Sequence, residues 1–139
     1  MEGREILKIR GIPLRVHQSW FLILTLFTWS AQKQLVNVSE IPLPTWSTWF
    51  LAFITSLLLF ASVLLHELGH SFMALHEGVQ VRSITLFFLG GVAKVEKECS
   101  NPMGTFRIAL AGPLVSLSLA GLLLFGANYI STFNILFSK

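Results

Sequence analysis

The chain has 139 residues, enough for one domain, and 53% of them are hydrophobic while only 12% are charged. A soluble domain carries about 25% charged residues, so this composition excludes a soluble globular protein and predicts a membrane protein. The formal net charge is only +3 and no basic run alternates with aromatic residues, which excludes nucleic acid as an expected partner. Cys99 is the single cysteine, which excludes an internal disulfide and a CxxC metal pair.

The first patterned segment is residues 6–16, in which apolar and polar side chains alternate. Gly11 and Pro13 interrupt the alternation, which predicts one or two short strands near the membrane surface. The N-terminal residues lack the short apolar core and the small-residue cleavage site of a cleavable signal peptide.

Residues 17–32 form the first predicted transmembrane helix. The stretch from Val16 to Gln32 has no charge apart from a possible one on His17, and Trp20 and Trp29 lie near its ends. Crossing a bilayer takes about 17–25 residues, and tryptophan favours the membrane interface. The polar, proline-bearing residues 33–44 are predicted to be a loop.

The second predicted transmembrane helix covers residues 46–76, and Gly78 is expected to end it. Residues 79–89 are rich in β-branched and aromatic side chains, and Gly90-Gly91 and a second strand-like run at 92–97 follow. Two such runs around a Gly-Gly pair predict a β-hairpin, with an irregular loop as the alternative.

The third predicted transmembrane helix covers residues 106–130. No residue from 108 to 138 is charged, and small residues recur there, which allows helices to approach closely in lipid. Pro113 is expected either to start the spanning portion or to kink it.

The cationic side chains are unevenly distributed between the two sides of the predicted bundle. Eight lie before the first helix or between the second and third helices, and Lys33 and Lys139 lie on the opposite side. The positive-inside rule therefore predicts that the N-terminus and the hairpin are cytoplasmic. The eight residues are Arg4, Lys8, Arg10, Arg15, Arg82, Lys94, Lys97 and Arg107.

These elements predict an all-α membrane protein with a single domain over residues 1–139. It has three transmembrane helices and a small β-hairpin at the cytoplasmic membrane face. The expected location is a multi-pass position in the lipid bilayer of the cell membrane, or of a thylakoid membrane in a photosynthetic source.

A metal-binding pattern, His66-Glu67-Leu68-Gly69-His70, lies inside the second predicted helix. His66 and His70 are about 40° apart around the helix and about 6 Å along it, so both imidazoles can bind one Zn2+ ion. Glu67 is offset by one residue, where it can take a proton from water that zinc activates and pass it to a leaving nitrogen. A solvated helix face is the alternative, but a glutamate at membrane depth costs about 2.5–3.5 kcal/mol on insertion scales.

Four segments together resemble the site-2 protease family, the intramembrane zinc metalloproteases of peptidase family M50. They are residues 11–17 (Gly-Ile-Pro-Leu-Arg-Val-His), the motif at 66–70, residues 88–93 (Phe-Leu-Gly-Gly-Val-Ala) and Ala111-Gly112-Pro113, in the family's order and spread over nearly the whole chain. The zinc motif alone is shared by many peptidases, and its setting is more specific.

The resemblance implies that His66 and His70 bind zinc and that Glu67 is the general base. It implies that the substrate is a transmembrane segment of another protein, often a membrane-tethered transcription factor or an anti-sigma factor. It also implies that part of residues 84–92, including Phe87, Phe88, Gly90 and Gly91, binds the unwound substrate as an added strand. A purely structural hairpin is the alternative.

One departure from the family concerns the third zinc ligand, an aspartate in a Leu-Asp-Gly motif on a later helix. This chain contains no aspartate, although catalytic zinc usually has three protein ligands. We expect the chain to be an N-terminal portion whose site is completed by further helices of the same longer protein or by another subunit. His76 would point about 240° away from His70, and Glu77 would lie about 10 Å further along the helix than His70, so neither is expected to bind the same ion.

Two other functions remain as alternatives to an endopeptidase. A non-catalytic membrane subunit or pseudoprotease would keep the motif without the third ligand. A metal transporter would need polar residues from several helices along one path, and the third helix offers only Ser116, Ser118 and Asn128.

Overall fold

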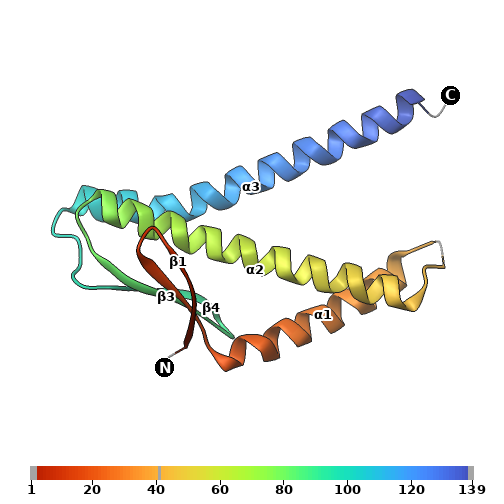
Figure 1. Ribbon diagram of the computed structural model, residues 1–139. Helices are drawn as coiled ribbons and strands as arrows, with labels where there is room; N and C mark the ends of the chain where they lie inside the picture. Colours follow the sequence, from red (N-terminus) through yellow and green to blue (C-terminus); the bar gives the residue numbers. More distant parts are fainter. Residues whose placement is uncertain (1–2, 41, 138–139) are drawn as a thin grey trace.

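The computed structural model describes residues 3–40 and 42–137, which form three long helices and one small sheet (Figure 1). Helix α2 is central: α1 crosses its N-terminal half, while the sheet and the start of α3 lie against its C-terminal half. In chain order the elements are β1 (Arg4–Ile9), β2 (Ile12–Val16), α1 (Gln18–Val38), α2 (Thr45–His76), β3 (Val81–Phe87), β4 (Gly90–Val95) and α3 (Pro102–Phe137). Lys139, which entered the charge comparison, lies outside the described residues.

The sheet has the strand order β1-β2-β3-β4. The predicted N-terminal strands and the predicted hairpin are both present, and Arg10 and Gly11 join β1 to β2 with φ values of 49° and 82°, the backbone conformation of a tight hairpin turn. Strand β2 pairs with β3 in parallel, with Leu14 opposite Ile84. The expected fold class is therefore corrected, because the strands form one mixed four-stranded sheet and not an isolated hairpin beside helices.

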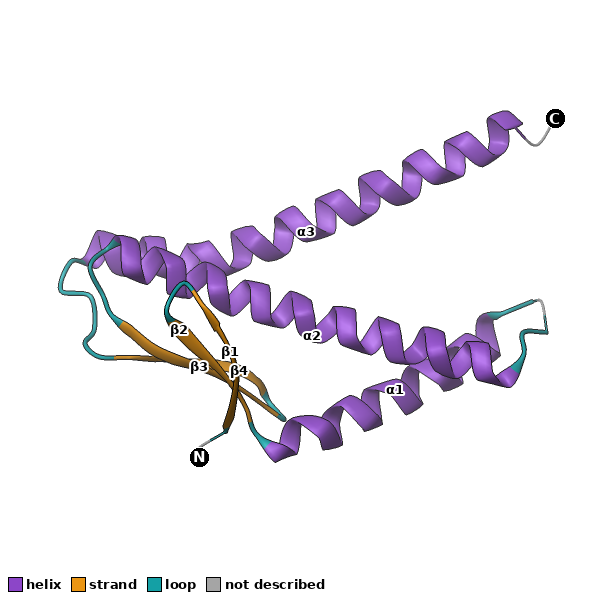
Figure 2. Cartoon of the chain, viewed as in Figure 1, coloured by secondary structure: helices purple, strands orange, loops and turns teal. Residues whose placement is uncertain are grey.

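One face of this sheet packs on α2 and forms the core (Figure 2). Alternate side chains of β2 and β3 point to the same face, and they enclose Leu68 of the His-Glu motif segment in a cluster. The buried members of the cluster are Ile12, Leu14, Val16, Leu68, Ile84 and Leu86. The sheet therefore holds the motif turn of α2 in a fixed position.

Helix α1 is longer than its sequence predicted. It continues through Lys33 to Val38, and the backbone N–H of Ser39 donates to the Leu35 carbonyl at its end. The expectation of a loop beginning at residue 33 is wrong because polarity alone does not end a helix, and neither glycine nor proline occurs before Pro42.

Two described helices, α2 over Thr45–His76 and α3 over Pro102–Phe133, are long and apolar enough to cross a membrane, and each contains an 18-residue stretch with a mean hydropathy of 2.2. Helix α1 is not one of them, because polar residues such as Gln18, Gln32 and Lys33 lie near its ends. The first predicted transmembrane helix, at residues 17–32, is therefore not confirmed as a membrane span.

Helix α3 begins at Pro102, so it contains the whole of the predicted spanning segment at residues 106–130. Its start at Pro102 follows Asn101, whose side-chain oxygen accepts a hydrogen bond from the Met103 backbone N–H at 3.1 Å, as an N-cap does. Pro113 lies inside the helix, so the helix begins before this proline, and the start of its membrane-spanning portion stays a prediction.

Replacing Ile84 by alanine should destabilise the packing of the sheet on α2, because the side chain is only 1% exposed. The expected loss of unfolding free energy is about 2–5 kcal/mol, measured by denaturation in detergent micelles. Val92→Ala on β4 is the control, since Val92 is 45% exposed. Equal destabilisation by the two variants would contradict the assignment of the core.

Candidate metal centre

The two motif histidines turn toward each other across one turn of α2. Their Nε2 atoms are 3.1 Å apart, and their ring planes are inclined at 79°. Two nitrogens bound to one tetrahedral zinc ion at about 2.0–2.1 Å each would lie about 3.3 Å apart. The observed pair therefore fits two ligand positions of a zinc ion, and both side chains are half-buried.

The other ring nitrogens of these histidines contact α3. His70 Nδ1 lies 2.7 Å from the Ile108 carbonyl oxygen, and His66 Nδ1 lies 2.8 Å from Ser116 Oγ. A carbonyl only accepts, so His70 Nδ1 carries the hydrogen and leaves the Nε2 lone pair free for a metal. Histidine ligands typically donate their second N–H in this way.

Gly112 makes room for one of the histidines. A Cβ atom at Gly112 would overlap the imidazole of His70, and one at Gly69 would lie 2.8 Å from Val115 Cγ2 and 3.0 Å from the Ala111 carbonyl oxygen. The absence of side chains on these glycines lets α2 and α3 approach closely. The motif glycine therefore has the packing role that close helix contacts in lipid require.

Strand β4 lies beside Glu67. A Cβ atom added to Gly91 would lie 2.7 Å from Glu67 Cγ, so only glycine lets the strand pass this close. Within the part of the chain that the structure describes, the Glu67 carboxylate has no hydrogen bond or ion pair. The structure therefore brings together Glu67 and Gly91, which the sequence predicted for catalysis and for substrate binding.

The other residues expected to bind substrate lie at the turn between β3 and β4. The rings of Phe87 and Phe88 have centroids 5.9 Å apart, and the Phe88 N–H donates to Ser19 Oγ at 3.2 Å. Gly90 approaches α2, because an added Cβ would lie 3.8 Å from Val63 Cγ1. The turn between β3 and β4 therefore contacts the start of α1 on one side and α2 on the other.

The remaining histidines and the carboxylate near the motif have other positions. His17 caps α1 and accepts from the Ser19 N–H at 3.2 Å, His76 is exposed at the end of α2, and Glu77 pairs with Arg107 at 3.2 Å. Over residues 3–40 and 42–137, no three His, Cys, Asp or Glu side chains are grouped so that they could hold a metal. In that part of the chain, the motif thus brings together one pair of candidate ligands, His66 and His70.

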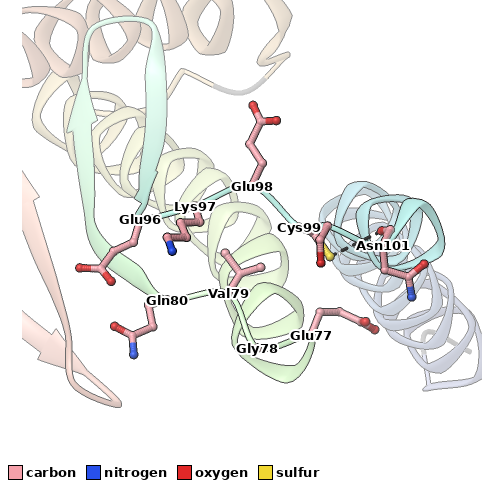
Figure 3. A pocket seen from close by; sticks show the side chains of 10 residues that line it. Glu77, Gly78, Val79, Gln80, Glu96, Lys97, Glu98, Cys99 and Asn101 are labelled. Carbon is pink, nitrogen blue, oxygen red and sulfur yellow. Dashed lines mark hydrogen bonds between the residues drawn. The ribbon is translucent and has the colours of Figure 1, made fainter.

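A cavity of about 530 Å³ lies beyond the C-terminal end of α2, between the ends of the β3–β4 hairpin and the start of α3 (Figure 3). Its lining includes Glu77, Glu96, Glu98 and Cys99 but none of the motif residues. Glu77 and Glu96 form ion pairs with Arg107 and Arg82. We therefore do not assign the cavity to the metal centre.

Two groups at the centre were not identified as contacts from the sequence. The sequence marks Ser116 only as a polar residue of the third predicted helix, and nothing in it distinguishes the carbonyl group of Ile108. The available signal was their spacing, since residues 108, 112 and 116 recur every four positions and so lie along one helix face.

Replacing Gly112 by alanine should displace the His70 imidazole and lower the zinc content of the purified protein, measured by metal analysis. Gly121→Ala on the same helix is a matched control, because an added Cβ there meets nothing within 4 Å among the described atoms. Equal zinc content in the two variants, with helix content unchanged, would show that His70 does not need this space.

Comparison with known proteins places the chain in a family. The profile of peptidase family M50 matches residues 54–138. A Synechocystis protein named provisionally as a zinc metalloprotease, sll0528, is 52% identical over 109 residues, which cover 78% of this chain and 28% of that protein. Rip3 of Mycobacterium tuberculosis, also named provisionally as a zinc metalloprotease, is 41% identical over 114 residues, 81% of this chain and 28% of that protein.

A solved structure of the site-2 protease from Methanocaldococcus jannaschii is also similar. It superposes with a TM-score of 0.64 at 36% identity, covering 91% of this chain and 52% of that one. The chain thus spans about 28% of the length of the two curated relatives described above. The family match includes the His-Glu motif and the whole described α3, and the chain belongs to peptidase family M50.

Proposed function

We propose that this protein is a zinc-dependent intramembrane endopeptidase of the site-2 protease type. The observation that carries the proposal is the 3.1 Å approach of His66 Nε2 to His70 Nε2, with Glu67 on the same helical turn. His66 and His70 are the proposed zinc ligands. When bound, zinc supplies a Lewis acid that polarises a carbonyl group and makes water more acidic.

Glu67 is the proposed general base. Its carboxylate is half-buried and has no competing ion pair among the described residues, so it remains available to water beside the histidines. It takes a proton from the attacking water and delivers it to the leaving amide nitrogen, which is how a carboxylate supports peptide hydrolysis. Gly91 keeps β4 close without displacing this carboxylate.

The proposed substrate is a transmembrane segment of a membrane-tethered protein. Both α2 and α3 are apolar enough to span a bilayer, and the histidines belong to α2, so the site would act on segments within or near lipid. We propose α1 as the third spanning helix of the single domain, with the N-terminus cytoplasmic and the protein multi-pass in the cell membrane or a thylakoid membrane.

The third zinc ligand is proposed to come from further helices of the same longer protein or from another subunit. The described residues group only two metal-binding side chains at the motif, and catalytic zinc usually has three protein ligands. The curated relatives are longer than this chain, which supports a source of that kind.

The alternative function is a non-catalytic membrane subunit or pseudoprotease. It would apply to a protein in which no further segment completes the site, because two imidazoles without a third protein ligand do not form a standard catalytic zinc site. The two candidates differ in one measurable property, which is peptide cleavage by the zinc-loaded protein.

Glu67→Gln should leave zinc bound and lower cleavage of a single-span membrane substrate by at least about 10²-fold, because a general base typically contributes 10²–10⁴-fold. Glu40→Gln is the control, since Glu40 is exposed and precedes α2. Cleavage would be followed by gel electrophoresis with the protein in its membrane. Unchanged cleavage by the Glu67 variant would exclude this mechanism, and a zinc-loaded parent that never cleaves would favour the pseudoprotease.

The substrate is proposed to bind along β4 as an added strand. Strand β4 is at the edge of the sheet, and its Gly91 lies beside Glu67. An edge strand offers unpaired backbone groups to an extended peptide, so an unwound substrate segment would run past the proposed base. Phe87, Phe88 and Gly90 would contact it at the turn.

A photo-crosslinking side chain in place of Val92 on β4 should capture the substrate, whereas one in place of Leu7 on β1 should not. Both side chains are exposed, and they lie on the two opposite edge strands of the sheet. Crosslinked products would be identified by mass spectrometry. Capture from Leu7 alone would place the substrate on the wrong edge for this proposal.

A further inference from the structure

One face of α3 lies along the C-terminal half of α2, which carries the His-Glu motif. Gly104, Ile108, Gly112 and Ser116 recur every four positions, and we refer to them as the α3 ridge. A Cβ at Gly104 would meet Glu77 Oε2 at 2.9 Å. The Ile108 carbonyl and Gly112 meet His70, and Ser116 meets His66. The two helices therefore run antiparallel, and the ridge reaches both proposed zinc ligands.

Ser116 differs in its bonding from the serine and threonine residues that follow it in α3. Ser118, Ser131 and Thr132 each donate to a carbonyl of their own helix at 2.8–2.9 Å. Ser116 Oγ instead lies 2.8 Å from His66 Nδ1 on the neighbouring helix. A hydroxyl in an apolar helix is commonly satisfied by its own backbone, so the interhelical contact of Ser116 is the exception among these four.

The contact determines which ring nitrogen of His66 faces the metal centre. Rotation of the imidazole about its bond to Cβ could present either ring nitrogen or a carbon atom to the centre. The hydroxyl of Ser116 can accept the Nδ1 hydrogen, and this leaves the Nε2 lone pair directed at His70 Nε2, 3.1 Å away. Ser116 thereby orients the His66 ring by accepting its Nδ1 hydrogen, as the Ile108 carbonyl orients the His70 ring.

We infer that Ser116 is a positioning residue for zinc binding, acting through His66. The inference rests on the proposed function, since it concerns how the two histidines are held as zinc ligands. Outer-shell partners of ligating histidines typically change metal affinity by about 10–100-fold when they are removed. The same range is expected for loss of the Ser116 hydroxyl.

The test is zinc competition against a chromophoric chelator, with the protein purified in detergent from its membrane. Ser116→Ala should weaken zinc binding by about 10–100-fold, while Ser116→Thr, which keeps the hydroxyl, should retain most of the affinity. Ser118→Ala is the matched control, because its hydroxyl bonds only to the Leu114 carbonyl in the structure. Helix content by circular dichroism checks that each variant is folded.

The outcomes separate this inference from the function on which it rests. If the parent binds zinc and Ser116→Ala binds it equally well, the positioning role is wrong and the protease proposal is unaffected. Equal losses in Ser116→Ala and Ser118→Ala, or a loss in Ser116→Thr as large as in the alanine variant, would also overturn it, because the effect would not come from this hydroxyl. If the folded parent binds no zinc, the proposed function fails and the inference fails with it.

Discussion

The close approach of α2 and α3 is the constraint on which the metal centre depends. At Gly69 and Gly112 there is no space for a Cβ atom without displacing Val115, Ala111 or the His70 ring. Small residues at a helix crossing permit such contact in lipid, where packing has to replace the hydrophobic drive available in water. The short separation brings the Ile108 carbonyl and the Ser116 hydroxyl within hydrogen-bonding distance of the two histidines.

The sheet supplies the second constraint, on the opposite side of the motif turn. Leu68 packs into the cluster formed by β2 and β3, while its neighbour Glu67 faces Gly91 of β4. Successive residues of one helical turn thus contact three different neighbours, which are the α3 ridge, the core of the sheet and the edge strand β4. This division follows from the 100° step between residues in an α-helix, and it explains how Leu68 can be buried while the neighbouring Glu67 keeps a free carboxylate.

Those parts of the molecule that depend on local sequence could be predicted, and those that depend on distant contacts could not. The His66–His70 pairing follows from helix geometry alone, and the β3–β4 hairpin follows from its Gly-Gly pair. The parallel pairing of β2 with β3 joins Leu14 to Ile84, and no local pattern encodes such a partner. The contact of Ser116 with His66 likewise depends on the register between two helices, which composition and periodicity leave open. The end of α1 does not follow from polarity, because the polar residues after Gln32 continue the helix where neither glycine nor proline interrupts the backbone.

The parallel pairing of β2 with β3 also has a consequence for biosynthesis. The β1–β2 hairpin leaves the ribosome well before its partner strand, since Leu14 and Ile84 are separated by seventy positions. At translation rates of about 5–20 residues per second, this delay is on the order of four to fourteen seconds. Throughout that interval the apolar side chains of Ile12, Leu14 and Val16 have no β3 to pack beside, so this part of the core closes only after residues 81–87 have been synthesised.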